Sequence, residues 1–199
     1  MTNNDQQKTA RKVAPNTADH RLHINQLNVL RGIVLVISNL SHQQNAGDIC
    51  CLTGPNGAGK STLLRTIAGR LPAAGGDISC AAPIIYVGHA DGLSGAISGQ
   101  ENLAGWAKIN GFSATETAID TALSSFATNR FAGLPVRVLS RGQRRRLALA
   151  RLALAPASSL WLLDEPNAGL DQASSSILDE IVQKHASTGG MALDRKSVV

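Results

Sequence analysis

The chain has 199 residues, a length that suggests one domain, or one domain with a small lobe attached, and that permits a sizeable hydrophobic core. Its composition, 43% hydrophobic and 17% charged, excludes disorder of the whole chain. No apolar run approaches the roughly 18 residues that a membrane-spanning helix needs. The formal net charge of +5 is compatible with an anionic partner and also with an ordinary protein surface. Aromatic residues make up only 3%, too few for a protein that stacks single-stranded bases.

Residues 1–20 are polar and contain neither an apolar stripe nor the apolar segment of a secretory signal. We expect a disordered tail there, followed by a single domain over residues 21–199. Short aliphatic runs after Leu22 predict strands, the strongest over residues 33–37. A turn at residues 46–48 leads into a short buried strand, Ile49–Leu52.

The three cysteines, Cys50, Cys51 and Cys80, give an odd count without the spacing of metal ligands. Cys50 and Cys51 are adjacent in a predicted strand, so their side chains point to opposite faces. We expect core thiols in a protein of a reducing compartment.

The middle of the chain alternates helical and strand patterns. Apolar residues at helical spacing predict a helix that Gly69 ends, residues 71–77 resemble a loop, and residues 84–87 predict a strand. Residues 100–134 predict short helices with breaks at Gly111 and Gly133, which we expect to form a small helical lobe over about residues 95–139.

The last third continues this alternation. Residues 138–154 predict a helix-containing segment, and residues 160–163 are apolar on both faces, as a central parallel strand should be. A helix is predicted over residues 177–185. The pattern therefore predicts an α/β fold with a mostly parallel sheet. The end of the chain resembles a truncated terminus, so we expect the final strand to be incomplete and a sheet edge to stay unpaired.

The segment Gly54-Pro55-Asn56-Gly57-Ala58-Gly59-Lys60-Ser61 matches the phosphate-binding pattern G-x-x-x-x-G-K-S without a mismatch. Its glycines let backbone N–H groups turn inward around a phosphate, and the helix that follows, with Thr62 in its first turn, directs its N-terminal dipole at the same anion. We expect Lys60 to reach the β- and γ-phosphates and Ser61 to hold Mg²⁺. A glycine-rich turn that merely contains Lys-Ser is the alternative, and the flanking strand and helix argue against it.

Asp164 and Glu165 follow the apolar strand directly. Such a pair is by itself often a solvated strand end. A parallel sheet, however, brings Asp164 to the edge where the phosphate loop begins, where it can hold Mg²⁺. Glu165 can then act as the base that polarises an attacking water.

A third motif separates the families that share these two. Ser140 is a natural N-cap, and Gln143 completes a capping box three residues later. With Gly142, these residues resemble the signature of ABC-type ATPases, and residues 167–171 resemble the D-loop of that family. The resemblance implies that two copies sandwich two ATP molecules head to tail, with this helix start contacting the nucleotide of the other copy. A capped helix without a ligand is the alternative.

Softer motifs resemble the ATP-binding subunits of haem exporters in cytochrome c biogenesis. They include the stretch from Tyr86 to Leu93, the arginines after Gln143, and Trp161 in the strand before Asp164. In ABC ATPases a glutamine usually follows the strand before the helical lobe, as a contact to Mg²⁺ and water. Here His89 stands at that place, so the resemblance makes it a catalytic candidate, with an exposed loop histidine as the alternative.

Five arginines, Arg141, Arg144, Arg145, Arg146 and Arg151, suggest a nucleic-acid patch at first sight. Three of them spread around more than half of a helix, however. We therefore expect a solvated face, or a contact to an acidic loop of a membrane partner, rather than nucleic acid.

Two features depart from the family. No aromatic residue stands between Leu30 and Ser41, where many ABC ATPases stack the adenine, and no histidine follows Leu193, where they carry a switch histidine.

The resemblance implies ATP and Mg²⁺ as cofactors and a homodimer at the cytoplasmic face of the inner membrane, acting with integral membrane subunits in haem export or haem-chaperone release. A regulatory subunit that binds ATP without hydrolysing it, and an ATPase for another small-molecule exporter, remain open. An ABC ATPase that acts on DNA or ribosomes would need a coiled-coil insertion or a second cassette.

Overall fold

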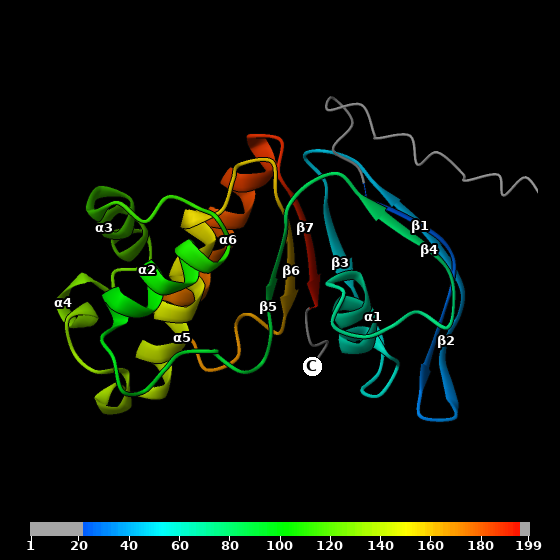
Figure 1. The fold of residues 1–199 in the computed structure, drawn as a ribbon, viewed down its shortest axis with the longest axis horizontal. Coiled ribbons are helices and arrows are strands. Elements are labelled where there is room, and N and C mark those ends of the chain that lie inside the picture. Colours follow the sequence, from blue (N-terminus) through cyan, green and yellow to red (C-terminus); the bar gives the residue numbers. More distant parts are fainter. Residues whose placement is uncertain (1–21, 196–199) are drawn as a thin grey trace, which may run out of the picture.

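The computed structural model describes residues 22–195; the predicted tail over residues 1–20 and the last four residues lie outside that range. Within it, an antiparallel sheet, a parallel sheet and a group of helices follow one another along the long axis of the molecule (Figure 1). The phosphate-loop strand and helix lie between the antiparallel sheet and the rest of the parallel sheet.

The antiparallel sheet has the strand order β2-β1-β4, formed by β1 (Leu22–Arg31), β2 (Val34–Gln44) and β4 (Gly75–Cys80). Strand β4 was not predicted, because its first three residues lie in the segment that resembles a loop. The reason is Gly76, whose φ is +79° and whose added Cβ would lie 2.3 Å from the carbonyl oxygen of Gln26 on β1. A glycine is required for that close approach, and the same glycine gives the sequence its loop-like composition.

The parallel sheet has the order β3-β7-β6-β5, formed by β3 (Ile49–Leu52), β7 (Met191–Arg195), β6 (Leu160–Asp164) and β5 (Ile84–Val87). The prediction of a central, two-sided apolar strand is confirmed, since all five residues of β6 are buried. The prediction that the last strand leaves a sheet edge unpaired is wrong. Strand β7 pairs with both β3 and β6, and thereby joins the phosphate-loop strand to the rest of the sheet.

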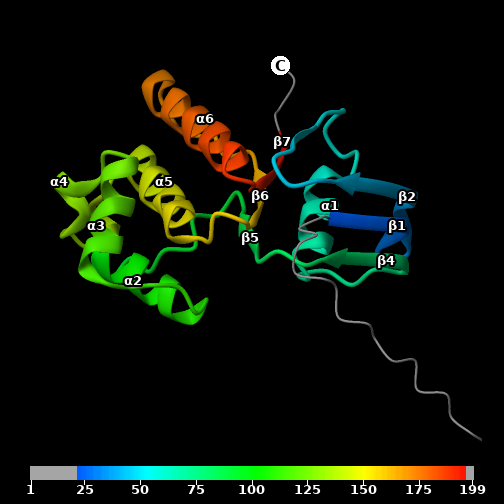
Figure 2. The ribbon, with the colours of Figure 1, turned by 90° about the horizontal axis from the view of Figure 1, so that it is seen from above.

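Helix α1 (Lys60–Ile67) covers one face of the parallel sheet, whereas α5 (Arg141–Ala150) and α6 (Gln172–Ser187) lie on the other side (Figures 1 and 2). Helix α6 starts five residues before the predicted helix, because Asp171 caps it by accepting the N–H of Ser174 at 2.8 Å.

Short helices occupy the region of the predicted lobe. They are α2 (Gly99–Ile109), α3 (Glu116–Ser125), α4 (Asn129–Ala132) and the 3₁₀ turn η1 (Val136–Val138), and a second 3₁₀ turn, η2 (Arg151–Leu154), extends α5. The predicted break at Gly111 is confirmed, since this residue lies between α2 and α3 with φ +72°. The other predicted break, Gly133, directly follows α4 as its C-cap residue.

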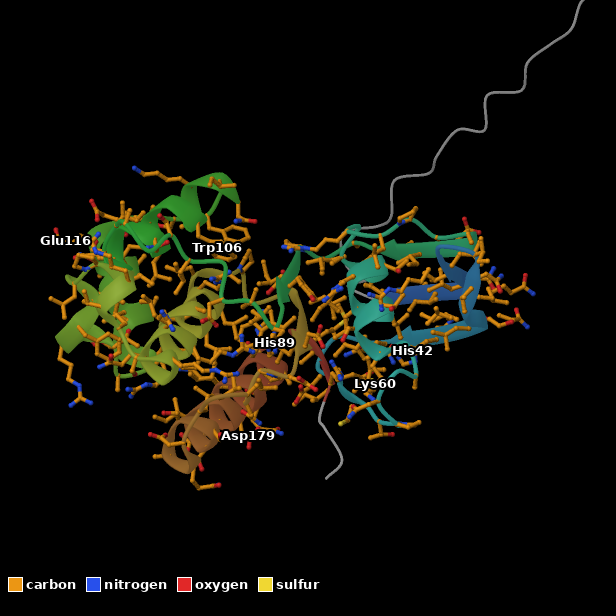
Figure 3. All side chains as sticks on the ribbon, turned by 90° about the horizontal axis from the view of Figure 1, so that it is seen from below. His42, Lys60, His89, Trp106, Glu116 and Asp179 are labelled. Atoms are coloured by element: carbon orange, nitrogen blue, oxygen red, sulfur yellow. The ribbon has the colours of Figure 1, made fainter. Side chains whose placement is uncertain are left out.

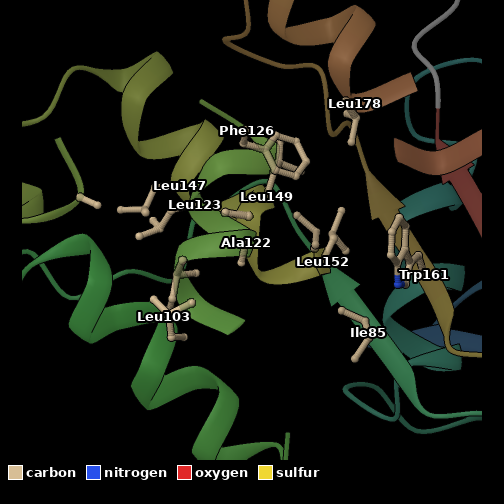
Figure 4. Close-up of a cluster of buried hydrophobic side chains, with 14 of the residues drawn as sticks. Ile85, Leu103, Ala122, Leu123, Phe126, Leu147, Leu149, Leu152, Trp161 and Leu178 are labelled. Atoms are coloured by element: carbon tan, nitrogen blue, oxygen red, sulfur yellow. The ribbon is translucent and has the colours of Figure 1, made fainter. Parts of the chain in front are cut away.

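Strand β6 divides the interior into two cores. Trp161 and Leu163 pack with Ile85 and with the helices of the lobe, α5 and α6 (Figure 4). Leu160 and Leu162 pack instead with α1, β1 and β7. Because side chains alternate along a strand, even-numbered residues of β6 face α1 and odd-numbered ones face α5 and α6.

The expectation of core thiols is only partly met. Cys51 is exposed, and Cys50 and Cys80 are half-buried, all three as free thiols. Cys51 is exposed because β3 is an edge strand of the parallel sheet.

A matched pair of glycine substitutions tests the packing behind β7. An added Cβ at Gly190 would lie 2.2 Å from Nε2 of His185, a buried ring that stacks on Trp161 with 3.6 Å between ring centroids. We expect Gly190→Ala to lower the free energy of unfolding by about 1–3 kcal/mol, the usual cost of overpacking. Gly105→Ala, in helix α2 with nothing within 4 Å of the added Cβ, should raise it by about 0.5–1 kcal/mol. Denaturant unfolding measures both, and equal effects of the two substitutions would contradict this packing.

Candidate functional site: a phosphate loop and the carboxyl edge of the sheet

The phosphate loop joins β3 to α1 and is shaped by three glycines at positive φ, namely Gly54, Gly57 and Gly59. Gly59 is the N-cap of α1, and an added Cβ there would lie 2.8 Å from Cγ1 of Val36 on β2. Lys60 follows as the first helical residue. It is buried, and its Nζ donates to the carbonyl oxygens of Gly54 and Pro55, the latter at 2.8 Å. The end of the loop is therefore joined to its start by the charged Nζ of Lys60.

The remaining predicted site residues of the loop and of α1 differ in their exposure. Asn56 and Ala58 are exposed, and Ala58 donates its N–H to the carbonyl oxygen of Pro55 at 3.2 Å. Thr62 is buried in the first turn of α1.

Ser61 and Asp164 meet across the edge of the parallel sheet, as the sequence predicts. The Ser61 hydroxyl donates to Oδ1 of Asp164 at 2.9 Å, and Asp164 is 1% exposed. The contact follows from parity: Asp164 is an even-numbered residue of β6 and therefore faces α1, which carries Ser61 in its first turn.

Two further side chains join this pair, and sequence reasoning missed both. The hydroxyl of Tyr86, on β5, donates to Oδ2 of Asp164 at 3.2 Å. Arg195, at the end of β7, donates through Nη1 to Ser61 Oγ at 2.7 Å and to Asp164 Oδ1 at 2.9 Å. Both lie on the face that Asp164 occupies, so strand alternation is a signal that could have found them.

Glu165 leaves the sheet in a different direction. Its φ is +54°, a left-handed conformation that costs a residue with a Cβ about 1–2 kcal/mol. Its carboxylate Oε1 lies 2.9 Å from Nη2 of Arg195. One guanidinium therefore contacts the predicted metal-binding carboxylate, the predicted general base and the predicted metal-binding hydroxyl.

A hollow of about 220 Å³ opens beside the phosphate loop. Its lining comes from the loop and α1, from the antiparallel sheet and from β7: Arg31, Val36, Gly57, Gly59, Lys60, Ser61, Thr62 and Arg195. Sequence reasoning missed Arg31 and Val36, which both stand in the segment between Leu30 and Ser41 that lacks an aromatic residue. The sheet side of this hollow is aliphatic and cationic.

The signature residues lie at the start of α5, and the predicted capping box is confirmed. The backbone N–H of Gln143 donates to Ser140 Oγ at 3.2 Å, and that of Ser140 donates to Gln143 Oε1 at 2.8 Å. An added Cβ at Gly142 would lie 3.2 Å from the carbonyl oxygen of Gly169, so the signature approaches the D-loop closely. Helix α5 and the phosphate-loop helix α1 lie on opposite sides of the sheet, which separates Ser140 from its own phosphate loop (Figure 2).

His89 is exposed and lies between the helical lobe and the strands (Figure 3). It lines a hollow of about 590 Å³ that Arg65 of α1 and Tyr86 also line. It also lines a hollow of about 480 Å³ together with Asp91, the start of α5 and Ala168 of the D-loop. His89 therefore lies between the signature and D-loop on one side and the surroundings of Tyr86 on the other.

The arginine-rich segment is not one solvated face, and that expectation is wrong for two residues. Arg145 and Arg151 are buried, at 3% and 8% exposure. Burial lowers the pKa of both guanidinium groups, that of Arg151 to about 10, and both remain charged at neutral pH. Arg141 is exposed, and Arg146 lies over the ring of Phe131 at 5.5 Å.

The donor set at the edge of the sheet fits a hard divalent cation. Ser61 Oγ and Asp164 Oδ1 are oxygen donors 2.9 Å apart, the ligand type that Mg²⁺ prefers. A cationic guanidinium already contacts both oxygens, which indicates that the pair accommodates positive charge. Ser61 and Asp164 are thus the residues that would hold Mg²⁺.

Comparisons with known proteins agree with this arrangement. Residues 37–168 match the family described as ABC transporter. The chain is 44% identical to a cytochrome c biogenesis ATP-binding export protein of Rhodospirillum rubrum, over 82% of this chain and 74% of that protein. It is also 44% identical to the protein of the same description from Rhodobacter capsulatus, over 86% and 78% of the two chains.

Solved structures share the fold. The chain superimposes on a putative ABC transporter ATP-binding protein of Pyrococcus furiosus with a TM-score of 0.78 at 24% identity, over 90% of this chain and 92% of that one. An ATP-binding subunit of an ABC transporter gives a TM-score of 0.81 at 23% identity, over 89% and 79% of the two chains.

We expect Arg195→Ala to strengthen the binding of ATP in the presence of Mg²⁺. The substitution removes a guanidinium that competes with the metal for Ser61 and Asp164. Since a hydrogen bond to a charged group contributes about 1.5–3 kcal/mol, the affinity should rise at least roughly tenfold. Titration with a fluorescent ATP analogue measures it, with Arg130→Ala, an exposed residue of α4, as the control. Weaker binding by Arg195→Ala would mean that Arg195 supports the nucleotide instead.

Proposed function

We propose a function that starts from one fact: this chain belongs to the ABC transporter family of ATP-binding proteins. It binds ATP with Mg²⁺ at the phosphate loop, closes as a homodimer around two nucleotides, and hydrolyses ATP to reopen. The contact between Ser61 and Asp164 at 2.9 Å is the observation that carries this proposal, because it joins the phosphate loop to the carboxylate that a metal–nucleotide complex requires.

Each residue of the site has a chemical role in this proposal. Lys60 exchanges its loop carbonyl partners for the β- and γ-phosphates, and the N-terminus of α1 donates backbone N–H groups to the same anion. Mg²⁺, when bound by Ser61 and Asp164, neutralises charge on the phosphate oxygens. Glu165 accepts the proton of the attacking water.

The second copy completes the site. Ser140, Gly142 and Gln143 begin a capped helix on the opposite side of the sheet from the phosphate loop, so their N–H groups suit a nucleotide held by a partner. We place His89 beside this interface, as a side chain that contacts the water or metal when the dimer closes. We also propose that residues 21–199 form a single domain and that residues of about 95–139 form its helical lobe.

The relatives point to the process served. The two Rhodospirillum and Rhodobacter proteins carry the description of cytochrome c biogenesis ATP-binding export proteins. We therefore propose that this chain is the ATP-binding subunit of a haem-export or haem-chaperone release system and that it acts as a translocase. None of the helices within residues 22–195 is long and apolar enough to cross a membrane. We propose that integral membrane subunits hold it peripherally at the cytoplasmic face of the inner membrane.

A positively charged hollow supports an acidic partner surface. Arg65, Arg70 and Arg151 line a hollow of about 590 Å³ together with Tyr86 and Trp106. Among the described residues, none of the three arginines pairs with a carboxylate side chain within 4 Å. This chemistry suits carboxylates of a membrane subunit, and we do not assign nucleic acid as a partner.

One observation favours the regulatory alternative, in which the chain binds ATP without hydrolysing it. The ion pair between Arg195 and Glu165, at 2.9 Å, engages the proposed general base. An ATPase that energises another small-molecule exporter would use the same site residues, so transport of haem itself rests on the relatives.

Glu165→Gln tests the proposed function. The substitution keeps the metal ligands but removes the base, so hydrolysis should fall at least ~100-fold while ATP with Mg²⁺ drives the chain into a stable dimer. Size-exclusion chromatography with and without ATP measures the dimer. Lys60→Ala is the matched control, which loses nucleotide binding and stays monomeric. A Glu165→Gln protein that binds ATP and remains a monomer would contradict the sandwich.

A further inference from the structure

Arg145 is the least exposed charged residue of the arginine-rich segment, at 3% exposure, and the functions assigned above do not use it. A buried charge is costly unless it is fully hydrogen-bonded. Its partners therefore indicate what the position is for, and they come from two loops that are separate in the sequence.

The first loop follows Asp164. Arg145 donates through Nη2 to the carbonyl oxygen of Glu165 at 2.8 Å, and through Nε to that of Pro166 at 3.0 Å. These two carbonyls belong to consecutive residues, and Glu165 has the strained φ of +54°. The planar guanidinium thereby holds the backbone of the proposed general base in a conformation that it would otherwise avoid.

The second loop follows β5. Nη1 of Arg145 donates to the carbonyl oxygen of Gly88 at 2.8 Å and lies 3.4 Å from Oδ1 of Asp91. Gly88 directly precedes His89, the second catalytic candidate. The same guanidinium therefore fixes the backbone at the start of the segment that contains His89.

Helix α5 supplies the third connection. Arg145 lies two residues after Gln143, in the first turns of the helix whose start holds the signature. A movement of this helix would be transmitted directly to the backbone of Glu165 and Gly88. Lysine could not replace these contacts, since an ammonium lacks the planar fork that reaches three carbonyl groups in fixed directions.

We propose that Arg145 is a positioning residue for hydrolysis: it holds Glu165 and the Gly88–Asp91 segment in register with the signature helix, so that the general base is aligned when the partner's nucleotide engages that helix. The inference rests on the proposed function, because it concerns the same reaction. Arg145 acts through the backbone carbonyl oxygens of Glu165, Pro166 and Gly88, which makes it a positioning residue.

Arg145→Lys, which keeps the charge, and Arg145→Gln, which leaves no unpaired charge in the interior, test the inference, with Arg130→Lys and Arg130→Gln as exposed matched controls. We expect kcat for ATP to fall at least about tenfold in both Arg145 variants, with KM within about threefold of the wild type. In a Glu165→Gln background the same substitutions should cause no further loss of hydrolysis, because the base they align is already gone. A merely structural arginine would instead give additive losses, or a change in KM alone, and either result would overturn the inference.

Hydrogen exchange gives a readout that does not depend on turnover. We expect the backbone amides of two peptides, covering residues 84–92 and 160–171, to exchange faster in Arg145→Lys than in the wild type. In Arg130→Lys we expect neither peptide to change. Unchanged exchange in both segments would overturn the inference. A wild-type chain that binds ATP but shows no hydrolysis would contradict the proposed function instead, and exchange would still decide the role of Arg145.

Discussion

The meeting of Ser61 and Asp164 at the carboxyl edge of the parallel sheet is the constraint on which the rest of the site depends. It requires the phosphate-loop strand, the central strand β6 and helix α1 to have fixed relative positions. Strand β7 provides this, since it pairs with β3 on one side and with β6 on the other. Burial of every residue of β6 then stabilises the arrangement from both faces, and the 1% exposure of Asp164 keeps its carboxylate away from bulk water.

The alternation of side chains along β6 gives the two sides of the sheet different tasks. The α1 side holds the phosphate loop and the proposed metal ligands, whereas the α5 and α6 side holds the signature and the D-loop. Glu165 directly follows Asp164 at the end of β6, and its backbone is left-handed. The two consecutive residues can therefore have different roles, Asp164 as a proposed metal ligand and Glu165 as the proposed general base. Arg145 is the side chain that bridges this point to the signature helix, because its guanidinium donates to the carbonyl oxygens of Glu165 and Gly88 from the second turn of α5.

Local sequence patterns predicted the parts of the protein that local physics determines. The phosphate loop, the two-sided apolar strand and the capping box at Ser140 all depend on residues within a few positions of one another. Long-range pairing was not accessible in this way. Strand β4 depends on the approach of Gly76 to β1, and the central place of β7 depends on both of its neighbours. The burial of Arg145 depends on carbonyl oxygens more than 50 positions away in one case and 20 in another, which no helical periodicity reveals.

The dependence of ATP affinity on Mg²⁺ tests the central claim most directly, with Asp164→Asn compared against the wild type and against Asp179→Asn, an exposed residue of α6. Titration calorimetry with ATP, once with Mg²⁺ and once with a chelator, measures the difference. If Ser61 and Asp164 hold the metal, Mg²⁺ should strengthen ATP binding at least about tenfold in the wild type and in Asp179→Asn, and much less in Asp164→Asn. An equal response to Mg²⁺ in all three proteins would contradict the account.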